Sequence, residues 1–281
     1  MKVSTMAATN RPLAGKRVVI TRAPEQSGEL VRALEDLGAE VLSMPAVAFA
    51  PPEDWRALDE ALRNLESFDA VLFLSRNAVR YLLARSDELG IKCPALDSSD
   101  RLLAAVGPGT AEEAGKYGVK VNFVAKNRTG ESLVRELRDR LAGRAVLLPR
   151  SDRGDARISS ALREAGANVT EVVAYRTIAP KELDPPIVSD IRRAEVDAIV
   201  FASPSAYRNL CDAIGTAAMK HIGERVNFAA IGPATARAIR DSGARAGIEI
   251  SDPSTIGVQS LADSLAEFFQ RNSAAAPARS S

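Results

Sequence analysis

The sequence predicts an α/β protein made of two doubly wound lobes, each a parallel sheet covered by helices on both faces. Three observations lead to this fold class. Short apolar, β-branched runs alternate with helical segments along the chain. The same motifs occur twice, at an offset of 128 residues. This period is too long for a solenoid, so the internal duplication indicates two domain-sized halves.

The duplication is visible from the first expected strand onward. GKRVVITR, which ends at Arg22, matches GRAVLLPR, which ends at Arg150. FDAVLFLSRNAV, from Phe68, matches VDAIVFASPSAY, from Val196, at the same offset. AAVGPGTAE and AAIGPATAR form a third pair, which a loop difference of three residues shifts to an offset of 125. Taken alone, the repeat divides the chain into tandem halves near residue 142.

Each half is expected to contain the same elements in the same order. A strand (RVVIT or RAVLLP) leads into a helix whose apolar residues are spaced by three and four. Gly38 and Gly166 follow these helices, where a left-handed residue lets the chain leave the helix. Two further buried strands in each half precede further helices: AVLFLS and LLAAVG, then AIVFAS and FAAIG.

Composition favours a small molecule as the partner. The 37 basic and 36 acidic residues create no net field that would attract nucleic acid or a membrane surface. Cys93, Cys211 and the lone His221 fit no metal-binding spacing. No signal peptide and no run of membrane-spanning length is recognisable. A soluble, cytoplasmic protein without a metal is therefore expected.

Candidate binding residues follow the ends of the expected strands, where doubly wound sheets bind their ligands. Helix N-termini, hydroxyls and arginines suit carboxylates or phosphates. The same residue types also cap helices and form turns, so only the convergence of several loops indicates a site. The candidates are Thr21, Arg22, Ser75, Asn77, Gly107, Thr110, Arg150, Ser203, Ser205, Gly232 and Thr235.

The two copies differ in an extended segment that follows the first helix of each. LSMPAVAFAPP (residues 42–52) and TEVVAYRTIAP (residues 170–180) are β-prone and end in proline. At the common offset, Tyr175 stands in the place of Val47. A polar group present in one copy indicates a single asymmetric site, although tyrosine is also simply a good strand residue.

Sequence signatures of the common catalytic sites are absent, including GxGxxG after a strand, the Walker loop, GxSxG and HExxH. The ordered motifs GKRVVITR, FLSRNAV with FASPSA, VGPGTA with IGPATARAI, VVAYRT and TIGVQSLADSL resemble the uroporphyrinogen-III synthase family. The resemblance implies two flavodoxin-like lobes joined by a two-stranded β ladder. The implied divisions are 14–44 with 181–270 (first lobe), 53–172 (second lobe), and 45–52 and 173–180 (connecting arms). The ends, 1–13 and 271–281, are small, polar or Ala/Pro-rich without an apolar period and are expected to be flexible tails.

The resemblance also implies a reaction. The linear tetrapyrrole hydroxymethylbilane would be closed to uroporphyrinogen III, with inversion of ring D, loss of water and no cofactor. Tyr175 would be catalytic, as proton donor or hydrogen-bond partner of the departing hydroxyl, and the loop residues above would bind substrate. Asn77 stands where many relatives have arginine, and Ala234 where many have threonine. The protein would act as a monomer, in transient contact with the upstream deaminase.

Two other classes of protein remain open. A cytosolic two-lobed binding protein or sensor would have the same plan but would give Tyr175 no special purpose. A flavodoxin-like electron carrier would need an aromatic sandwich for the flavin, and 8 Phe, 4 Tyr and 1 Trp offer no obvious one. A colourless purified protein would exclude this second class.

Overall fold

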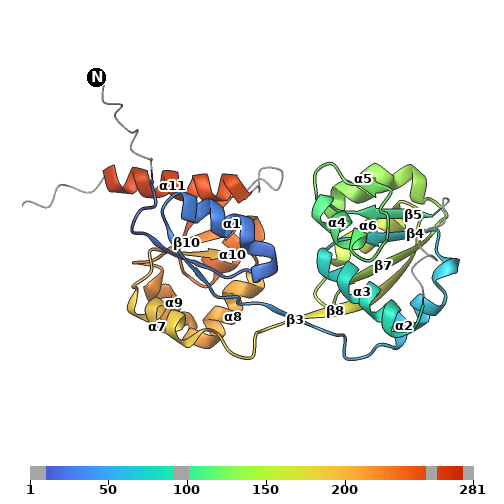
Figure 1. Ribbon diagram of the computed structural model, residues 1–281, viewed down its shortest axis with the longest axis horizontal. Helices are drawn as coiled ribbons and strands as arrows, with labels where there is room; N and C mark the ends of the chain where they lie inside the picture. Colours follow the sequence, from blue (N-terminus) through green and yellow to red (C-terminus); the bar gives the residue numbers. More distant parts are fainter. Residues whose placement is uncertain (1–10, 92–100, 251–257, 275–281) are drawn as a thin grey trace, which may run out of the picture. The chain divides into compact units, whose positions relative to one another are not determined.

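The chain forms two compact units (Figure 1). Unit 1 comprises residues 1–48 and 179–281, and unit 2 comprises residues 49–178. Both unit borders fall inside the segments 45–52 and 173–180, which the family resemblance assigns to connecting arms. The structure is a computed structural model that describes residues 11–91, 101–250 and 258–274.

Unit 1 is built on a five-stranded parallel sheet in the order β11-β10-β9-β1-β2. Its strands are β1 (Arg17–Ile20), β2 (Glu40–Ser43), β9 (Ala198–Phe201), β10 (Asn227–Ile231) and β11 (Ala246–Ile250). Its helices are α1 (Pro24–Asp36), α7 (Pro185–Arg193), α8 (Pro204–Ile214), α9 (Thr216–Ile222), α10 (Pro233–Asp241) and α11 (Val258–Ala274). The strand order reverses between β1 and β9, and doubly wound sheets bind ligands at such a switch point.

Unit 2 is built on a six-stranded sheet in the order β3-β8-β7-β4-β5-β6. Its strands are β3 (Ala48–Ala50), β4 (Ala70–Phe73), β5 (Leu102–Ala105), β6 (Phe123–Val124), β7 (Ala145–Ser151) and β8 (Asn168–Ile178). Its helices are α2 (Arg56–Arg63), the 3₁₀ turn η1 (Leu65–Ser67), α3 (Arg76–Glu88), α4 (Pro108–Gly115), α5 (Gly130–Leu141) and α6 (Ala156–Glu164). Here the order reverses between β7 and β4.

The repeat accounts for this common plan. At the offset of 128 residues, β7 and β8 correspond to β1 and β2, while β4 corresponds to β9. Matched in this way, the two sheets have the same strand order, and unit 2 adds β3 at one edge. Each sheet combines strands from both halves of the sequence, because β1 pairs with β9. The tandem split near residue 142 is therefore not how the sheets are assembled.

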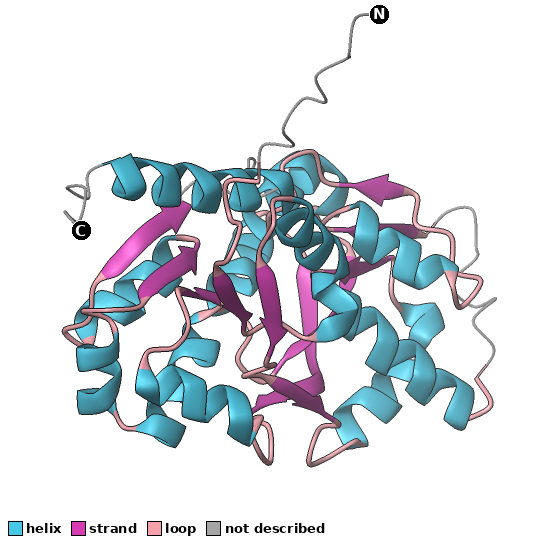
Figure 2. Cartoon of the chain, turned by 60° about the vertical axis from the view of Figure 1, so that its left-hand side comes forward, coloured by secondary structure: helices cyan, strands magenta, loops and turns pink. Residues whose placement is uncertain are grey.

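Strand residues alternate between two apolar faces in both units. In β1, Val19 packs into a cluster with α7, α8 and α9, whereas Val18 and Ile20 pack with α1 and α11. In β4, Val71 packs with α2 and α3, whereas Leu72 packs with α5 and α6. Each sheet thus carries helices on both faces (Figure 2), which confirms the predicted α/β class with parallel sheets.

The helix ends after β1 and β7 are also as expected. Gly38 follows α1 with φ +97°, and Gly166 follows α6 with φ +85°. These left-handed angles are strained for any residue with a Cβ. A Cβ on Gly38 would in addition lie 3.1 Å from the backbone nitrogen of Ala14.

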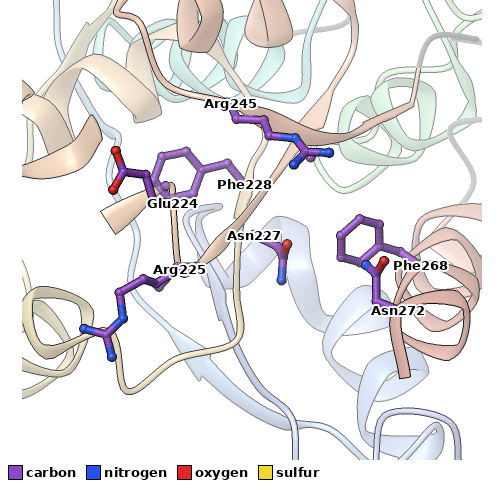
Figure 3. A pocket seen from close by; sticks show the side chains of 10 residues that line it. Glu224, Arg225, Asn227, Phe228, Arg245, Phe268 and Asn272 are labelled. Atoms are coloured by element: carbon purple, nitrogen blue, oxygen red, sulfur yellow. The ribbon is translucent and has the colours of Figure 1, made fainter. Parts of the chain in front are cut away.

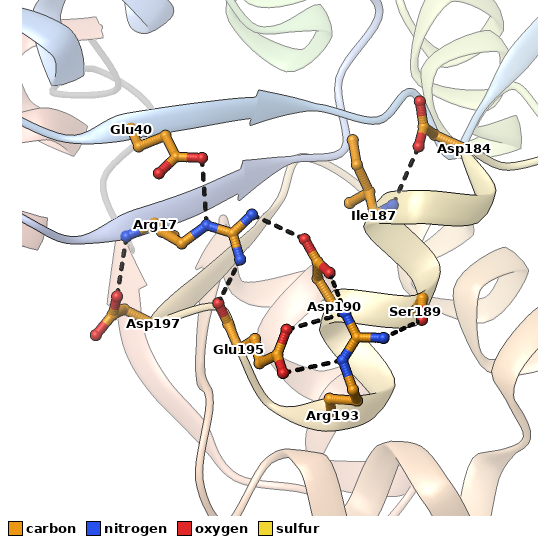
Figure 4. Close-up of polar contacts among 9 residues, drawn as sticks. All are labelled: Arg17, Glu40, Asp184, Ile187, Ser189, Asp190, Arg193, Glu195 and Asp197. Carbon is orange, nitrogen blue, oxygen red and sulfur yellow. Dashed lines mark hydrogen bonds and ion pairs between the residues drawn. The ribbon is translucent and has the colours of Figure 1, made fainter.

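The amino edge of the unit 1 sheet is tied together by ion pairs (Figure 4). Arg17 on β1 donates to Asp190 at 2.8 Å, to Glu40 at 3.2 Å and to the carbonyl of Glu195 at 2.7 Å. Arg193 reaches the same carboxylate of Asp190 at 2.7 Å. These contacts fasten α7 to β1 and β2, so this edge is occupied by the protein's own charges.

The chain ends differ in part from the expected tails 1–13 and 271–281. Leu13 is fully buried, and its N–H donates to the carbonyl of Leu37 at 2.9 Å. At the other end, α11 continues to Ala274. Residues 1–10 and 275–281, like Cys93, lie outside the described part of the chain. No helix within residues 11–91, 101–250 and 258–274 is long and apolar enough to cross a membrane.

Candidate active site

Tyr175 lies on β8, next to β7, and only 7% of its surface is exposed. Its hydroxyl is 3.1 Å from the Oγ of Ser75, at the end of β4. The ring of Tyr81 stacks on it with centroids 5.6 Å apart, and Phe49 meets it edge-on at 5.7 Å. The aromatic neighbours fix the plane of the ring, and the serine fixes the direction of the hydroxyl.

Burial raises the pKa of the Tyr175 phenol above its ordinary value. The hydrogen bond with Ser75 acts in the opposite direction, and the negative charge of Asp152 adds to the increase. Asp152 is itself held in place, because its N–H donates to the carbonyl of Tyr175 at 3.1 Å and its carboxylate accepts from the N–H of Thr177 at 2.9 Å. The phenol therefore stays protonated at neutral pH and can act as a donor.

Ser75 and Ser203 occupy matched positions and both cap helices. The Oγ of Ser75 accepts from the N–H of Ala78 at 3.0 Å at the start of α3. The Oγ of Ser203 accepts from Ala206 at 3.1 Å at the start of α8. Ser205 is half-buried in the first turn of α8. Ser75 and Ser203 therefore act as helix caps, which is the alternative interpretation of such residues, but Ser75 in addition contacts a phenol.

The two Gly-Pro turns have different backbone conformations. Gly107, before α4, is extended with φ −171°, whereas Gly232, before α10, has φ +86°. The hydroxyl of Thr235 donates to the carbonyl of Ile231 at 3.0 Å and is buried. Thr110 is 6% exposed, and its hydroxyl is hydrogen-bonded to no described residue.

Two other predicted residues, Thr21 and Arg22, follow β1, and Arg150 lies near the carboxyl end of β7. The buried hydroxyl of Thr21 donates to the carbonyl of Val200 at 2.7 Å, which joins β1 to β9. The Nε of Arg150 lies 2.8 Å from a carboxylate oxygen of Glu171. Arg22 is half-buried. Thr21 and Arg150 are therefore engaged with the protein itself in this state.

The structure sorts the predicted residues into two groups, one for each sheet. Tyr175, Ser75, Asn77, Gly107, Thr110 and Arg150 belong to unit 2, and the others to unit 1. Contacts missed from the sequence include the two rings around Tyr175 and the position of Arg76. The position of Arg76 could have been suspected from the sequence, because the two copies differ there. One copy has Arg76 and Gly109, whereas the other has Pro204 and Ala234 at the matched positions.

A small cavity of about 150 Å³ lies away from these residues, at the amino end of β10 (Figure 3). Arg225, Asn227, Arg245, Phe268 and Asn272 are among its lining residues, and none of the predicted site residues is. Among the described residues, no group of His, Cys, Asp and Glu side chains could hold a metal ion. The candidate site is therefore assigned from the strand ends and not from this cavity.

The two doubly wound parallel sheets, with a buried tyrosine on β8 hydrogen-bonded to Ser75 after β4, define the class of protein as a duplicated α/β fold. The family described as uroporphyrinogen-III synthase HemD matches residues 28–267. The chain belongs to the uroporphyrinogen-III synthase family.

Individual relatives agree with this assignment. The uroporphyrinogen-III synthase of Synechococcus elongatus is 31% identical over 229 residues, which cover 80% of this chain and 86% of that protein. The enzyme of the same name from Chlorobaculum parvum is 27% identical over 240 residues, with coverages of 83% and 92%.

Solved structures share the fold. A mutant uroporphyrinogen III synthase from the extremely thermophilic bacterium Thermus thermophilus has a TM-score of 0.57 at 21% identity, covering 92% of this chain and 100% of that one. A uroporphyrinogen-III synthetase from Helicobacter pylori has a TM-score of 0.52 at 18% identity, with coverages of 89% and 99%.

Proposed function

We propose that this chain catalyses the closure of hydroxymethylbilane to uroporphyrinogen III, with inversion of ring D and loss of one water. Membership of the family and the names of the relatives support the reaction. The observation that carries the proposal is the buried phenol of Tyr175, which contacts Ser75 at the end of β4.

The substrate itself supplies most of the reactivity. Its electron-rich pyrroles expel hydroxide from the terminal hydroxymethyl group and leave an azafulvenium cation. Attack by the substituted carbon of ring D gives a spiro intermediate, and reopening followed by closure delivers the inverted ring. The protein's tasks are to orient a flexible polycarboxylate, to assist the departure of hydroxide and to keep water away from the cation.

Tyr175 is suited to the second task. When the hydroxyl of Ser75 donates to the phenol oxygen, the phenolic hydrogen is left for the departing hydroxyl of the substrate. Because burial raises the pKa of Tyr175, the phenol remains protonated at neutral pH. A phenol is a weak acid, so we expect its contribution to be about 10- to 100-fold in rate.

The carboxylates of the substrate are the proposed ligands of the helix N-termini at the strand ends. The hydroxyls of Thr21 and Thr235 already donate to carbonyl groups, so their loops would contribute mainly backbone N–H groups. The proposed binding residues are Thr21, Arg22, Ser203, Ser205, Gly232 and Thr235 in unit 1, and Ser75, Asn77, Gly107, Thr110 and Arg150 in unit 2.

A coupled assay tests the proposed function. Hydroxymethylbilane is generated with its upstream deaminase in the presence of the chain, and the products are oxidised and separated as uroporphyrin isomers. A predominance of isomer III supports synthase activity. Isomer I alone, the product of unassisted closure, would contradict it and would favour a two-lobed binding protein without catalysis.

The proposal extends to the setting of the reaction. The chain would act in the cytoplasm as a monomer without a cofactor, and would receive its substrate through transient contact with the upstream deaminase. Segments 45–52 and 173–180 would serve as the connecting arms, in agreement with the unit borders inside them. Size-exclusion chromatography, cell fractionation and cross-linking to the deaminase test these points separately.

A further inference from the structure

Arg76, the first residue of α3, lies directly over Gly109 in the first turn of α4. A Cβ on Gly109 would lie 2.0 Å from the Nη2 atom of Arg76 and 2.7 Å from its Cζ. The guanidinium therefore fills space that only glycine leaves open. In the other copy the matched residues are Pro204 and Ala234, so the arginine and the bare glycine occur together in one copy and neither occurs in the other.

Arg128 approaches the same turn from the loop before α5. A Cβ on Gly107 would lie 3.5 Å from the Cγ of Arg128, so the aliphatic part of this arginine runs beside the turn. Arg128 has φ +53°, a left-handed conformation that is unfavourable for a residue with a side chain. Such outliers persist where the surrounding structure enforces them, often at functional sites.

The charges at this turn are not balanced by the protein. Arg76 and Arg128 are both exposed, and neither side chain forms an ion pair or hydrogen bond with a described residue. The first turns of α3 and α4 contain no acidic residue. The N-terminus of a helix carries a partial positive charge, which repels a guanidinium and attracts an anion. By contrast, Arg80 lies one turn further along and is paired with Glu113 at 3.2 Å.

Two buried polar side chains beside this turn also lack partners. Asn77 in the first turn of α3 is 4% exposed, and Thr110 in the first turn of α4 is 6% exposed. No described residue is hydrogen-bonded to either side chain. Buried polar groups are normally satisfied. The polar atoms of Asn77 and Thr110 are not among the fully enclosed atoms without a partner, so each keeps some contact with solvent.

We propose that Arg76 and Arg128 bind a carboxylate at the N-terminus of α4, with Asn77 and Thr110 as neutral hydrogen-bonding partners. The inference rests on the proposed function, because the polycarboxylate substrate supplies the anion. Two guanidinium groups and the helix N–H groups match a carboxylate in charge and geometry. Arg76 thereby becomes a residue that determines substrate binding in unit 2, whereas Pro204 leaves unit 1 without an equivalent.

Variants of the full-length chain test this assignment. Arg76→Ala removes one cation, and Arg128→Asn removes the other while keeping a residue that tolerates the left-handed conformation. Arg80→Ala is the matched control, because it removes an arginine from the same helix that is already paired. The readouts are KM and kcat with hydroxymethylbilane, and the Kd of uroporphyrin III, the stable oxidised product that keeps the carboxylates.

We expect Arg76→Ala and Arg128→Asn each to raise KM and the Kd of uroporphyrin by about 10- to 100-fold, with kcat changed less. Arg80→Ala should leave both constants within about twofold. If the wild-type chain forms isomer III but Arg76→Ala and Arg128→Asn show the same KM and Kd as the control Arg80→Ala, the inference is overturned and the proposed function stands. A wild-type chain that yields only isomer I would instead overturn the proposed function.

A competition experiment with inorganic phosphate distinguishes a site for the substrate's carboxylate from a site for a free anion with similar chemistry. We expect phosphate to displace uroporphyrin only weakly, since a single anion cannot use the other contacts of the polycarboxylate. Displacement by phosphate at the concentration at which uroporphyrin itself binds would contradict a substrate-carboxylate site.

Discussion

Units 1 and 2 have the same strand order but different loops at the carboxyl edges of their sheets. The turn before α4 is extended at Gly107, whereas the turn before α10 is left-handed at Gly232. Arg76 lies over Gly109 in unit 2, and a proline and an alanine stand at the matched positions of unit 1. The duplication therefore preserves the scaffold in both units and allows the loops to differ.

The same contrast holds on the strands. Val47 packs against the apolar cluster of unit 1, whereas Tyr175 at the matched position points its hydroxyl at Ser75. Tyr175 also belongs to the buried apolar cluster of unit 2, so the tyrosine keeps a core contact and adds a hydrogen-bonded phenol. At this position the asymmetry between the copies coincides with the residue that we propose as catalytic.

The first prediction concerns the ion pairs at the amino edge of the unit 1 sheet, an edge that lacks proposed site residues. Arg17→Ala should lower the free energy of unfolding by about 1 to 3 kcal/mol, because the partly buried Asp190 and the carbonyl of Glu195 both lose the guanidinium that joins α7 to β1. Arg193→Ala, at a more exposed position of the same network, should lower it much less. Urea unfolding measures both. A KM altered by Arg17→Ala in a folded protein would contradict the separation of the edges.

The second prediction concerns the two Gly-Pro turns. Gly232→Ala should cost about 1 to 2 kcal/mol more than Gly107→Ala, because only Gly232 has a positive φ. Both glycines precede a helix, so any loss of capping is common to both variants. The midpoints of urea unfolding provide the comparison. Equal midpoints would show that the turns share one conformation after all.

The third prediction exchanges two residues that occupy corresponding positions of the repeat, Gly109 in unit 2 and Ala234 in unit 1. Gly109→Ala should raise KM by about 10-fold, because the new Cβ displaces the guanidinium of Arg76. Ala234→Gly, the reverse change in unit 1, should leave KM unchanged and cost about 0.5 to 1 kcal/mol of stability in the helix. In an Arg76→Ala background, Gly109→Ala should raise KM no further. A full additional effect in that background would contradict the contact.

The fourth and smallest effect is expected on the pH profile. Since the pKa of Tyr175 is raised above its ordinary value of about 10, the folded protein keeps this phenol protonated through that pH and loses the proton only above it. The ratio of kcat between the wild type and Tyr175→Phe should therefore be constant from about pH 7 to about pH 9.5. A ratio that falls with a midpoint near pH 8 would show that the phenol ionises early.

Much of the fold could be predicted from the sequence, since β-branched runs and the glycines at 38 and 166 reflect local chain physics. The pairing of β1 with β9 could not, because nothing local records which half supplies a neighbouring strand. At the site, Tyr175 was visible as a difference between the copies. The position of Arg76 over Gly109, and the inward hydroxyls of Thr21 and Thr235, depend on tertiary contacts.

The most direct test of the central claim compares two buried tyrosines, one in each unit. Tyr175→Phe should lower kcat by about 10- to 100-fold and still yield isomer III, because the substrate supplies most of the reactivity. Tyr207 in α8 is hydrogen-bonded to Ser242 and has no part in the proposed reaction, so Tyr207→Phe should lower the melting temperature and leave kcat within about twofold. Equal kcat values in the two variants would contradict the assignment of the chemistry to unit 2.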